Sequence, residues 1–161
     1  MDQLLEARVG ELLNARGWNV CTAESCTGGL VAHRLTNIAG SSSYVLGGIV
    51  SYSNQAKQKL LGVHEATLVA YGAVSEETAA EMVQGVRAVF DADVAVSITG
   101  IAGPGGGTAE KPVGLTYIGL LLRDHEPQVR RHLWQGDREA VKNASAEAAL
   151  AWIVEALEAS P

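Results

Sequence analysis

A hydroxyl and a thiol stand side by side near the N-terminus, where Ser25 and Cys26 precede Thr27, Gly28 and Gly29. The segment lies between an expected strand and an expected helix. Free N–H groups at the beginning of a helix bind anions and stabilise a developing oxyanion, and glycines let a ligand approach the backbone. Ser25 or Cys26 is therefore a candidate nucleophile. A tight turn in which Ser25 caps the helix is the alternative, and no Gly-Lys-Ser/Thr follows that would indicate a phosphate-binding P-loop.

A serine nucleophile needs a base, and a lysine with a neutral amine can serve as one. Lys57 follows the end of a second expected strand within two turns, after Tyr52 and Asn54. A free lysine has a pKa of about 10.4, so burial or a nearby cation must lower that pKa by roughly 2 to 3 units before the amine acts as a base near pH 7. The spacing by itself favours a plainer interpretation, a solvated helix lysine beside Lys59.

A second glycine-rich segment follows a third expected strand. Thr99, Gly100, Gly103 and residues 105–107 bring many bare N–H groups together, which can form an anion-binding nest. The dinucleotide fingerprint Gly-x-Gly-x-x-Gly is not matched, because Thr108 stands where the last glycine would be. A mobile surface loop is the alternative for this segment.

Arg138 stands in the first turn of an expected helix capped by Asp137. A positive charge there opposes the helix dipole, and a contact with a phosphate would account for the placement. The four histidines show no paired ligand spacing, so we expect no metal site.

The segments that must position these residues alternate between helix and strand. We expect strands at 18–22, 44–52, 94–99, 113–122 and 128–134, and helices at 1–16, 30–38, 54–61, 65–71, 76–89 and 138–158. Asn54 is the expected N-cap of the third of these helices. This order predicts a single α/β domain over residues 1–161, with three α/β/α layers and a mainly parallel, mixed sheet. The connection 123–127 is too short for a parallel crossover, which predicts one antiparallel strand. Both glycine-rich segments follow strand ends, where ligands bind in open α/β sheets.

Composition narrows the classes of function. The chain has 161 residues and a net charge of −6 at pH 7, so we expect no general affinity for nucleic acid or anionic membranes, which needs a basic surface. No signal peptide and no apolar run of about 20 residues is found, and the cytoplasm is the expected location. We expect no disulfide between Cys21 and Cys26.

Four segments, in this order, resemble the CinA C-terminal domain family. They are residues 22–29, 47–54 with 56–57, 71–76, and 99–106 with 113–114. The step at 136–138 (Gly-Asp-Arg) fits as well, and together these segments span essentially the whole chain. Four co-linear motifs are far more specific than any one of them.

The resemblance implies hydrolysis of nicotinamide mononucleotide to nicotinic acid mononucleotide and ammonia, with no metal or cofactor. It implies Ser25 as nucleophile and Lys57 as its basic partner, with Tyr52 beside them. The segments that line the family's pocket would bind the substrate through Thr27, Gly28, Gly29, Asn54, Thr99, Gly100, Gly103 and Arg138. The chain looks like the stand-alone form of the family, without the nucleotide-processing domain of larger relatives. It departs from the family at Lys142, a place often held by arginine.

Two other classes of function fit the same residues. A cysteine hydrolase would use Cys26, since a thiolate at a helix N-terminus has a lowered pKa. A non-catalytic nucleotide-binding or regulatory module would use the glycine-rich loops to hold a phosphate without turnover. The partner in each case is a small-molecule nucleotide, and the sequence leaves open whether the chain forms a homo-oligomer that shares the pocket.

Overall fold

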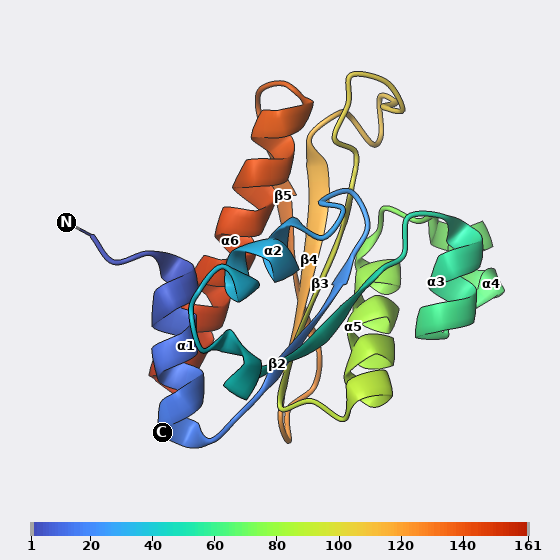
Figure 1. Ribbon diagram of the computed structural model, residues 1–161. Coiled ribbons are helices and arrows are strands. Elements are labelled where there is room, and N and C mark those ends of the chain that lie inside the picture. The colour runs from blue at the N-terminus through green and yellow to red at the C-terminus, as the bar shows by residue number, and fades with distance from the viewer. Residues whose placement is uncertain (1, 161) are drawn as a thin grey trace.

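A five-stranded sheet lies between two groups of helices in the computed structural model, which describes residues 2–160 (Figure 1). The strands are β1 (Val20–Glu24), β2 (Val45–Val50), β3 (Val94–Gly100), β4 (Leu115–Leu122) and β5 (Gln128–Leu133). The helices are α1 (Leu5–Arg16), α2 (Leu30–Thr36), α3 (Asn54–Leu61), α4 (Glu65–Tyr71), α5 (Glu76–Phe90) and α6 (Arg138–Ala159), with a short 3-10 turn η1 (Ser41–Ser43). The α/β class expected from the alternating segments is confirmed.

The sheet is mixed, with the order β2-β1-β3-β4-β5. Strand β1 pairs in parallel with both β2 and β3. Strand β4 runs antiparallel to β3 and to β5, as the short connection after Leu122 predicts. The carboxyl ends of β1, β2 and β3 therefore meet at one edge of the sheet, which lies at the top of Figure 1.

Apolar side chains fill both spaces between the sheet and the helices. Helices α1, α2 and α6 cover one face, and α3, α4 and α5 lie on the other (Figure 1). Every residue of β1 is buried, because a central strand with helices on both faces has no side in contact with water. A polar side chain on this strand must find its hydrogen-bond partners within the protein.

The position of α3 depends on a cap at its beginning and a close contact at its end. Ser53, not Asn54 as the sequence suggested, is the N-cap, and its hydroxyl accepts a hydrogen bond from the N–H of Ala56 at 3.0 Å. Ser53 has the extended backbone that an N-cap needs, whereas Asn54 is already helical. At the other end, Gly85 of α5 lies so close to α3 that an added Cβ would be 1.8 Å from the carbonyl oxygen of Leu61. The cap and this contact together fix the helix that carries Lys57.

Within residues 2–160, no helix combines the length and the apolar character needed to cross a bilayer.

Candidate active site

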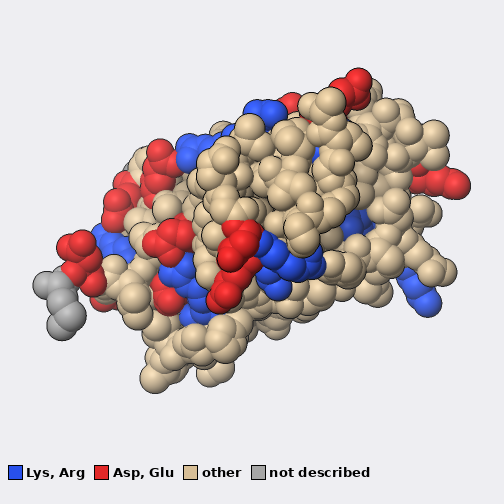
Figure 2. Space-filling model, turned by 90° about the horizontal axis from the view of Figure 1, so that it is seen from above, with Lys and Arg blue, Asp and Glu red and all other residues tan. Residues whose placement is uncertain are grey.

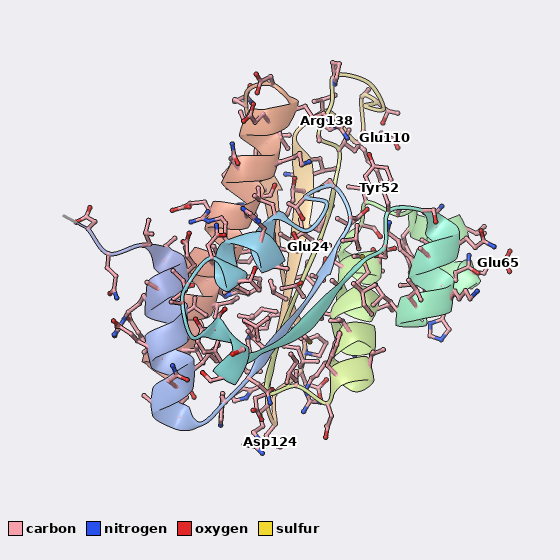
Figure 3. The ribbon with its side chains drawn as sticks, viewed as in Figure 1. Glu24, Tyr52, Glu65, Glu110, Asp124 and Arg138 are labelled. Carbon is pink, nitrogen blue, oxygen red and sulfur yellow. The ribbon has the colours of Figure 1, made fainter. Side chains whose placement is uncertain are left out.

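The ends of three strands bring the chemically capable side chains to one place. Ser25 follows β1 directly, Tyr52 follows β2, and Gly100 ends β3. Arg138, the first residue of α6, reaches the same edge of the sheet, where it lies beside Tyr52 in Figure 3. The site thus forms at the carboxyl ends of parallel strands, as expected for an open α/β sheet.

Ser25 and Lys57 are in direct contact at this edge. The Nζ of Lys57 lies 2.9 Å from the Oγ of Ser25. It also lies 2.7 Å from the carbonyl oxygen of Ser51 and 3.4 Å from that of Tyr52. Lys57 is 1% exposed and Ser25 is 8% exposed, so water has almost no access to the pair.

The surroundings of Lys57 favour the neutral amine. Burial lowers the pKa of Lys57 to about 8, because the charged form loses its hydration. No carboxylate within the described part of the chain forms an ion pair with it. A neutral amine has two N–H bonds and one lone pair. If the two N–H bonds are directed at the carbonyls of Ser51 and Tyr52, the lone pair is left to accept the hydroxyl proton of Ser25.

The thiol of Cys26 is placed differently. Cys26 is 5% exposed and packs with the apolar cluster under α2 and α6, and an added Cβ on Gly100 would lie 3.2 Å from its sulfur. Burial raises the pKa of the Cys26 thiol to about 11, the opposite of the lowered pKa that a helix N-terminus would give. The geometry therefore favours the hydroxyl of Ser25 over this thiol as the nucleophile.

A carboxylate of the protein itself already occupies the N-terminus of α2. The sequence led us to expect free N–H groups in this first turn, but the N–H groups of Val31 and Ala32 donate to the carboxylate of Glu24 at 2.9 and 3.1 Å. The N–H of Ser25 is also engaged, by the carbonyl of Ile98. The N–H groups of Cys26 and Thr27 donate to no other residue between positions 2 and 160. These two groups are the available oxyanion donors next to Ser25.

Arg138 links the second glycine-rich segment to the edge of β2. Its Nη1 donates to the carbonyl of Gly103 at 2.8 Å, and its Nη2 donates to the hydroxyl of Tyr52 at 2.9 Å. Figure 3 shows Arg138 and Tyr52 directed at one another from opposite sides of the site. Both partners are neutral, so an anionic ligand would compete well for this guanidinium.

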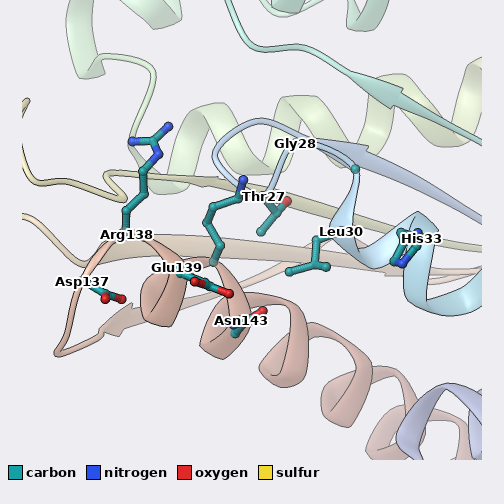
Figure 4. Close-up of a pocket in the computed structure, with 10 residues that line it drawn as sticks. Thr27, Gly28, Leu30, His33, Asp137, Arg138, Glu139 and Asn143 are labelled. Carbon is teal, nitrogen blue, oxygen red and sulfur yellow. The ribbon is translucent and has the colours of Figure 1, made fainter.

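Two cavities meet at Arg138. The smaller, of about 180 Å³, is lined by Ser25, Cys26, Tyr52, Lys57, Ala73, Val74, Thr99, Gly100, Ala102 and Arg138. The larger, of about 740 Å³, lies between the loop after β1 and the first turns of α6, and is lined by Thr27, Gly28, Gly29, Leu30, His33, Asp137, Arg138, Glu139, Lys142 and Asn143 (Figure 4). A ligand that fills both would pass the guanidinium of Arg138.

The expected site residues divide between these cavities, with two exceptions. Asn54 is exposed and lines neither cavity. Gly103 also lies outside both, and the group it presents to the site is a carbonyl rather than the expected N–H. Thr99 lines the smaller cavity, but its hydroxyl is engaged by the carbonyl of Ala73 at 2.8 Å.

Sequence reasoning missed several contributors. Glu24 lies in the segment 22–29 and received no role there, although a charged residue at the end of a buried strand is itself a signal. His33 and Asn143 line the larger cavity. Lys142, which the sequence marked only as a departure from the family, lines it as well. The Nζ of Lys142 lies 3.7 Å from where a Cβ on Gly28 would be. Their convergence depends on how α2 and α6 pack, and no local pattern indicates it.

The charge around the site is mixed. Acidic and basic side chains are interspersed on the face that carries the strand ends (Figure 2). Among residues 2–160, no three His, Cys, Asp or Glu side chains gather in a way that could hold a metal ion.

Fold and site together define an α/β protein with a buried serine–lysine pair at the carboxyl edge of its sheet. The model of the CinA C-terminal domain family matches residues 2–157, and the chain belongs to this family. It is 53% identical over 138 residues to a protein of Enterobacter agglomerans named nicotinamide-nucleotide amidohydrolase PncC, covering 86% of this chain and 84% of that protein.

Other relatives are longer or are known from their structures. A putative competence-damage inducible protein of Moorella thermoacetica is 55% identical over 149 residues, which are 92% of this chain and 36% of that protein. A CinA-like protein of Chloroherpeton thalassium is 52% identical, and the match spans 39% of its length. The crystal structure of the competence/damage inducible protein CihA from Agrobacterium tumefaciens superimposes with a TM-score of 0.91 at 41% identity, covering 98% of this chain and 99% of that chain.

Proposed function

We propose that this chain hydrolyses the carboxamide of nicotinamide mononucleotide to give nicotinic acid mononucleotide and ammonia, with Ser25 as nucleophile and Lys57 as base. The observation that carries the proposal is the 2.9 Å contact between the Oγ of Ser25 and the Nζ of a buried lysine. The name of the Enterobacter agglomerans relative supports the choice of substrate.

In the first half of the reaction, the neutral amine of Lys57 takes the proton of Ser25 as its Oγ attacks the carboxamide carbon. The carbonyl oxygen becomes an oxyanion, which the N–H groups of Cys26 and Thr27 stabilise. One such donor contributes typically about 3 to 4 kcal/mol to transition-state stabilisation. The protonated Lys57 then gives its proton to the leaving nitrogen, the C–N bond breaks, and ammonia departs from an acyl-enzyme.

In the second half, water attacks the acyl carbon and Lys57 accepts a proton from it. The ester bond to Ser25 breaks, Oγ takes the proton back from Lys57, and nicotinic acid mononucleotide leaves. The deep burial of Lys57 supports this role, because it keeps a useful fraction of the amine neutral near pH 7.

The two cavities that share Arg138 in their linings suit a substrate with an amide at one end and a phosphate at the other. We place the carboxamide in the smaller cavity beside Ser25 and the ribose phosphate in the larger one. There Arg138 and Lys142 supply positive charge, and the glycine pair after Thr27 lets the phosphate approach the backbone.

Release of ammonia from nicotinamide mononucleotide, its riboside and free nicotinamide tests the proposal. The wild-type chain should release ammonia from the mononucleotide, Ser25→Ala should release none while keeping its circular dichroism, and Cys26→Ala should remain active. Activity that survives Ser25→Ala and disappears in Cys26→Ala would assign the reaction to the thiol. Tight binding of the mononucleotide by the wild type with no ammonia formed would instead indicate a nucleotide-binding module.

A further inference from the structure

A buried carboxylate lies directly next to the proposed nucleophile. Glu24, the last residue of β1, is 1% exposed, and no Lys or Arg in the described part of the chain forms an ion pair with it. Figure 3 shows Glu24 near the upper end of the sheet, beneath the loop that carries Ser25. A charge in such a place is tolerated only when hydrogen bonds replace its hydration.

The hydrogen bonds come from the loop that contains Ser25 and from the two elements that flank it, β1 and α2. The Oε1 of Glu24 accepts from the hydroxyl of Thr27 at 2.7 Å and from the N–H of Val31 at 2.9 Å. Its Oε2 accepts from the N–H of Ala32 at 3.1 Å, with the hydroxyl of Thr22 at 3.5 Å. One side chain therefore ties the end of β1 to the loop and to the first turn of α2.

The loop needs such an anchor because of its glycines. Gly28 and Gly29 have φ of 61° and 103°, a region that glycine enters at little cost but that leaves the unfolded loop many alternatives. Helix α2 has seven residues, which is too short to be stable by itself. Ser25 lies between two anchored positions, Glu24 and Thr27, so its hydroxyl is held in line with Lys57.

We propose that Glu24 is a positioning residue for the amide hydrolysis, a role that rests on the function proposed above. Its carboxylate occupies the N-terminus of α2 and sets the geometry of residues 25–29. It engages the N–H groups in the first turn of α2, whereas the N–H groups of Cys26 and Thr27 donate to no other residue in the described part of the chain and remain for the oxyanion. Glu24 lines neither cavity, so it acts through the loop rather than on the substrate.

Glu24→Gln tests the role with almost no change in the shape of the side chain. The amide keeps one acceptor oxygen, but its NH₂ group faces a backbone N–H and cannot accept a hydrogen bond from it. We expect kcat to fall by about 10- to 100-fold, since a displacement of about 1 Å at a reacting group can cost that much, while KM stays the same. The pH at half-maximal kcat/KM should not move, because the loop and not Lys57 is disturbed.

Glu81→Gln is the matched control. The Glu81 carboxylate accepts from the N–H of His64 at 2.8 Å and contacts the hydroxyl of Thr67, at the beginning of α4. Like Glu24, it accepts from a backbone N–H and contacts a hydroxyl, and it also contacts the Nδ1 of His64 at 2.8 Å. It lies outside both cavities, so kcat should be unchanged. Equal kcat in the two variants, or a shift of the pH midpoint in Glu24→Gln, would overturn the proposal. If Glu24→Gln does not fold, Thr27→Val removes only the hydroxyl donor and should still lower kcat; an unchanged kcat in that variant would equally overturn it.

Amide hydrogen exchange separates this proposal from the proposed function, because it needs no turnover. Glu24→Gln should speed exchange across residues 25–32, and Glu81→Gln should leave those amides as in the wild type. Unchanged exchange in Glu24→Gln would remove the positioning role even in an active enzyme. A wild-type chain that releases no ammonia would refute the proposed function while faster exchange still supported the anchor.

Discussion

The pH dependence of the reaction follows directly from the burial of Lys57. Burial lowers the pKa of Lys57 from 10.5 to about 8, a difference of about 3 kcal/mol between the two protonation states. The neutral fraction at pH 7 is then about 10%, compared with about 0.03% for an unperturbed lysine, a gain of roughly 300-fold in reactive amine. We therefore predict that kcat/KM rises about tenfold per pH unit below pH 8 and levels off above it.

Initial rates of ammonia release from nicotinamide mononucleotide, between pH 6.5 and 10 at constant ionic strength, measure this profile. The range stays above the second pKa of a phosphate monoester, at about 6, so most of the substrate carries the doubly charged phosphate throughout. The Cys26 thiol, with a pKa of about 11, also stays protonated over most of it. A rise that continues to pH 10 without levelling off would show that Lys57 is not desolvated in solution, and a flat profile would show that its amine is not the base.

Three further predictions concern stability and the substrate. Between pH 8 and 10.5 the unfolded chain binds a proton at residue 57 that the folded chain does not. The free energy of unfolding of the wild type, measured with urea, should therefore rise by about 3 kcal/mol relative to that of Lys57→Met over this pH range. A difference between the two proteins that stays constant with pH would contradict this. Arg138→Met should lower kcat/KM for the mononucleotide by roughly 10- to 100-fold, the loss expected for a charged hydrogen bond. The kcat/KM for the riboside, which lacks the phosphate, should hardly change. Equal losses for the two substrates would show that Arg138 does not contact the phosphate. Gly85→Ala should destabilise the fold by about 1 to 3 kcal/mol or more and lower activity, because the new Cβ would meet the carbonyl of Leu61 at 1.8 Å. Thermal unfolding measures the loss of stability. Gly105→Ala is the neutral control, because a Cβ at that position meets nothing within 4 Å.

Much of the fold could be predicted because its determinants are local. Apolar spacing, capping residues and terminal glycines indicated the helices, and the short connection after Leu122 required β4 and β5 to be antiparallel. The N-cap of α3 was misplaced by one residue, since both Ser53 and Asn54 are good capping residues and only the backbone conformation distinguishes them.

The candidate site was predicted less completely, because its parts depend on packing. The free N–H groups expected at the beginning of α2 are engaged by Glu24. The direction of that side chain depends on how α2 packs over β1. Asn54 belongs to a segment that reaches the site, but the bend at Ser53 leaves its side chain exposed.

By itself, the sequence determined which groups are available and on which segments they lie. It indicated a hydroxyl after the first strand, an amine in the helix after the second, and glycine-rich segments after the first and the third. Only the tertiary structure decided that Ser25 and Lys57, 32 residues apart, meet at 2.9 Å and that Lys57 titrates near pH 8. Propensity and periodicity act between neighbours in the chain, whereas desolvation of an amine depends on every element packed around it. The close contact of α3 with Gly85 brings Lys57 into the protein interior, and burial there makes its amine a usable base.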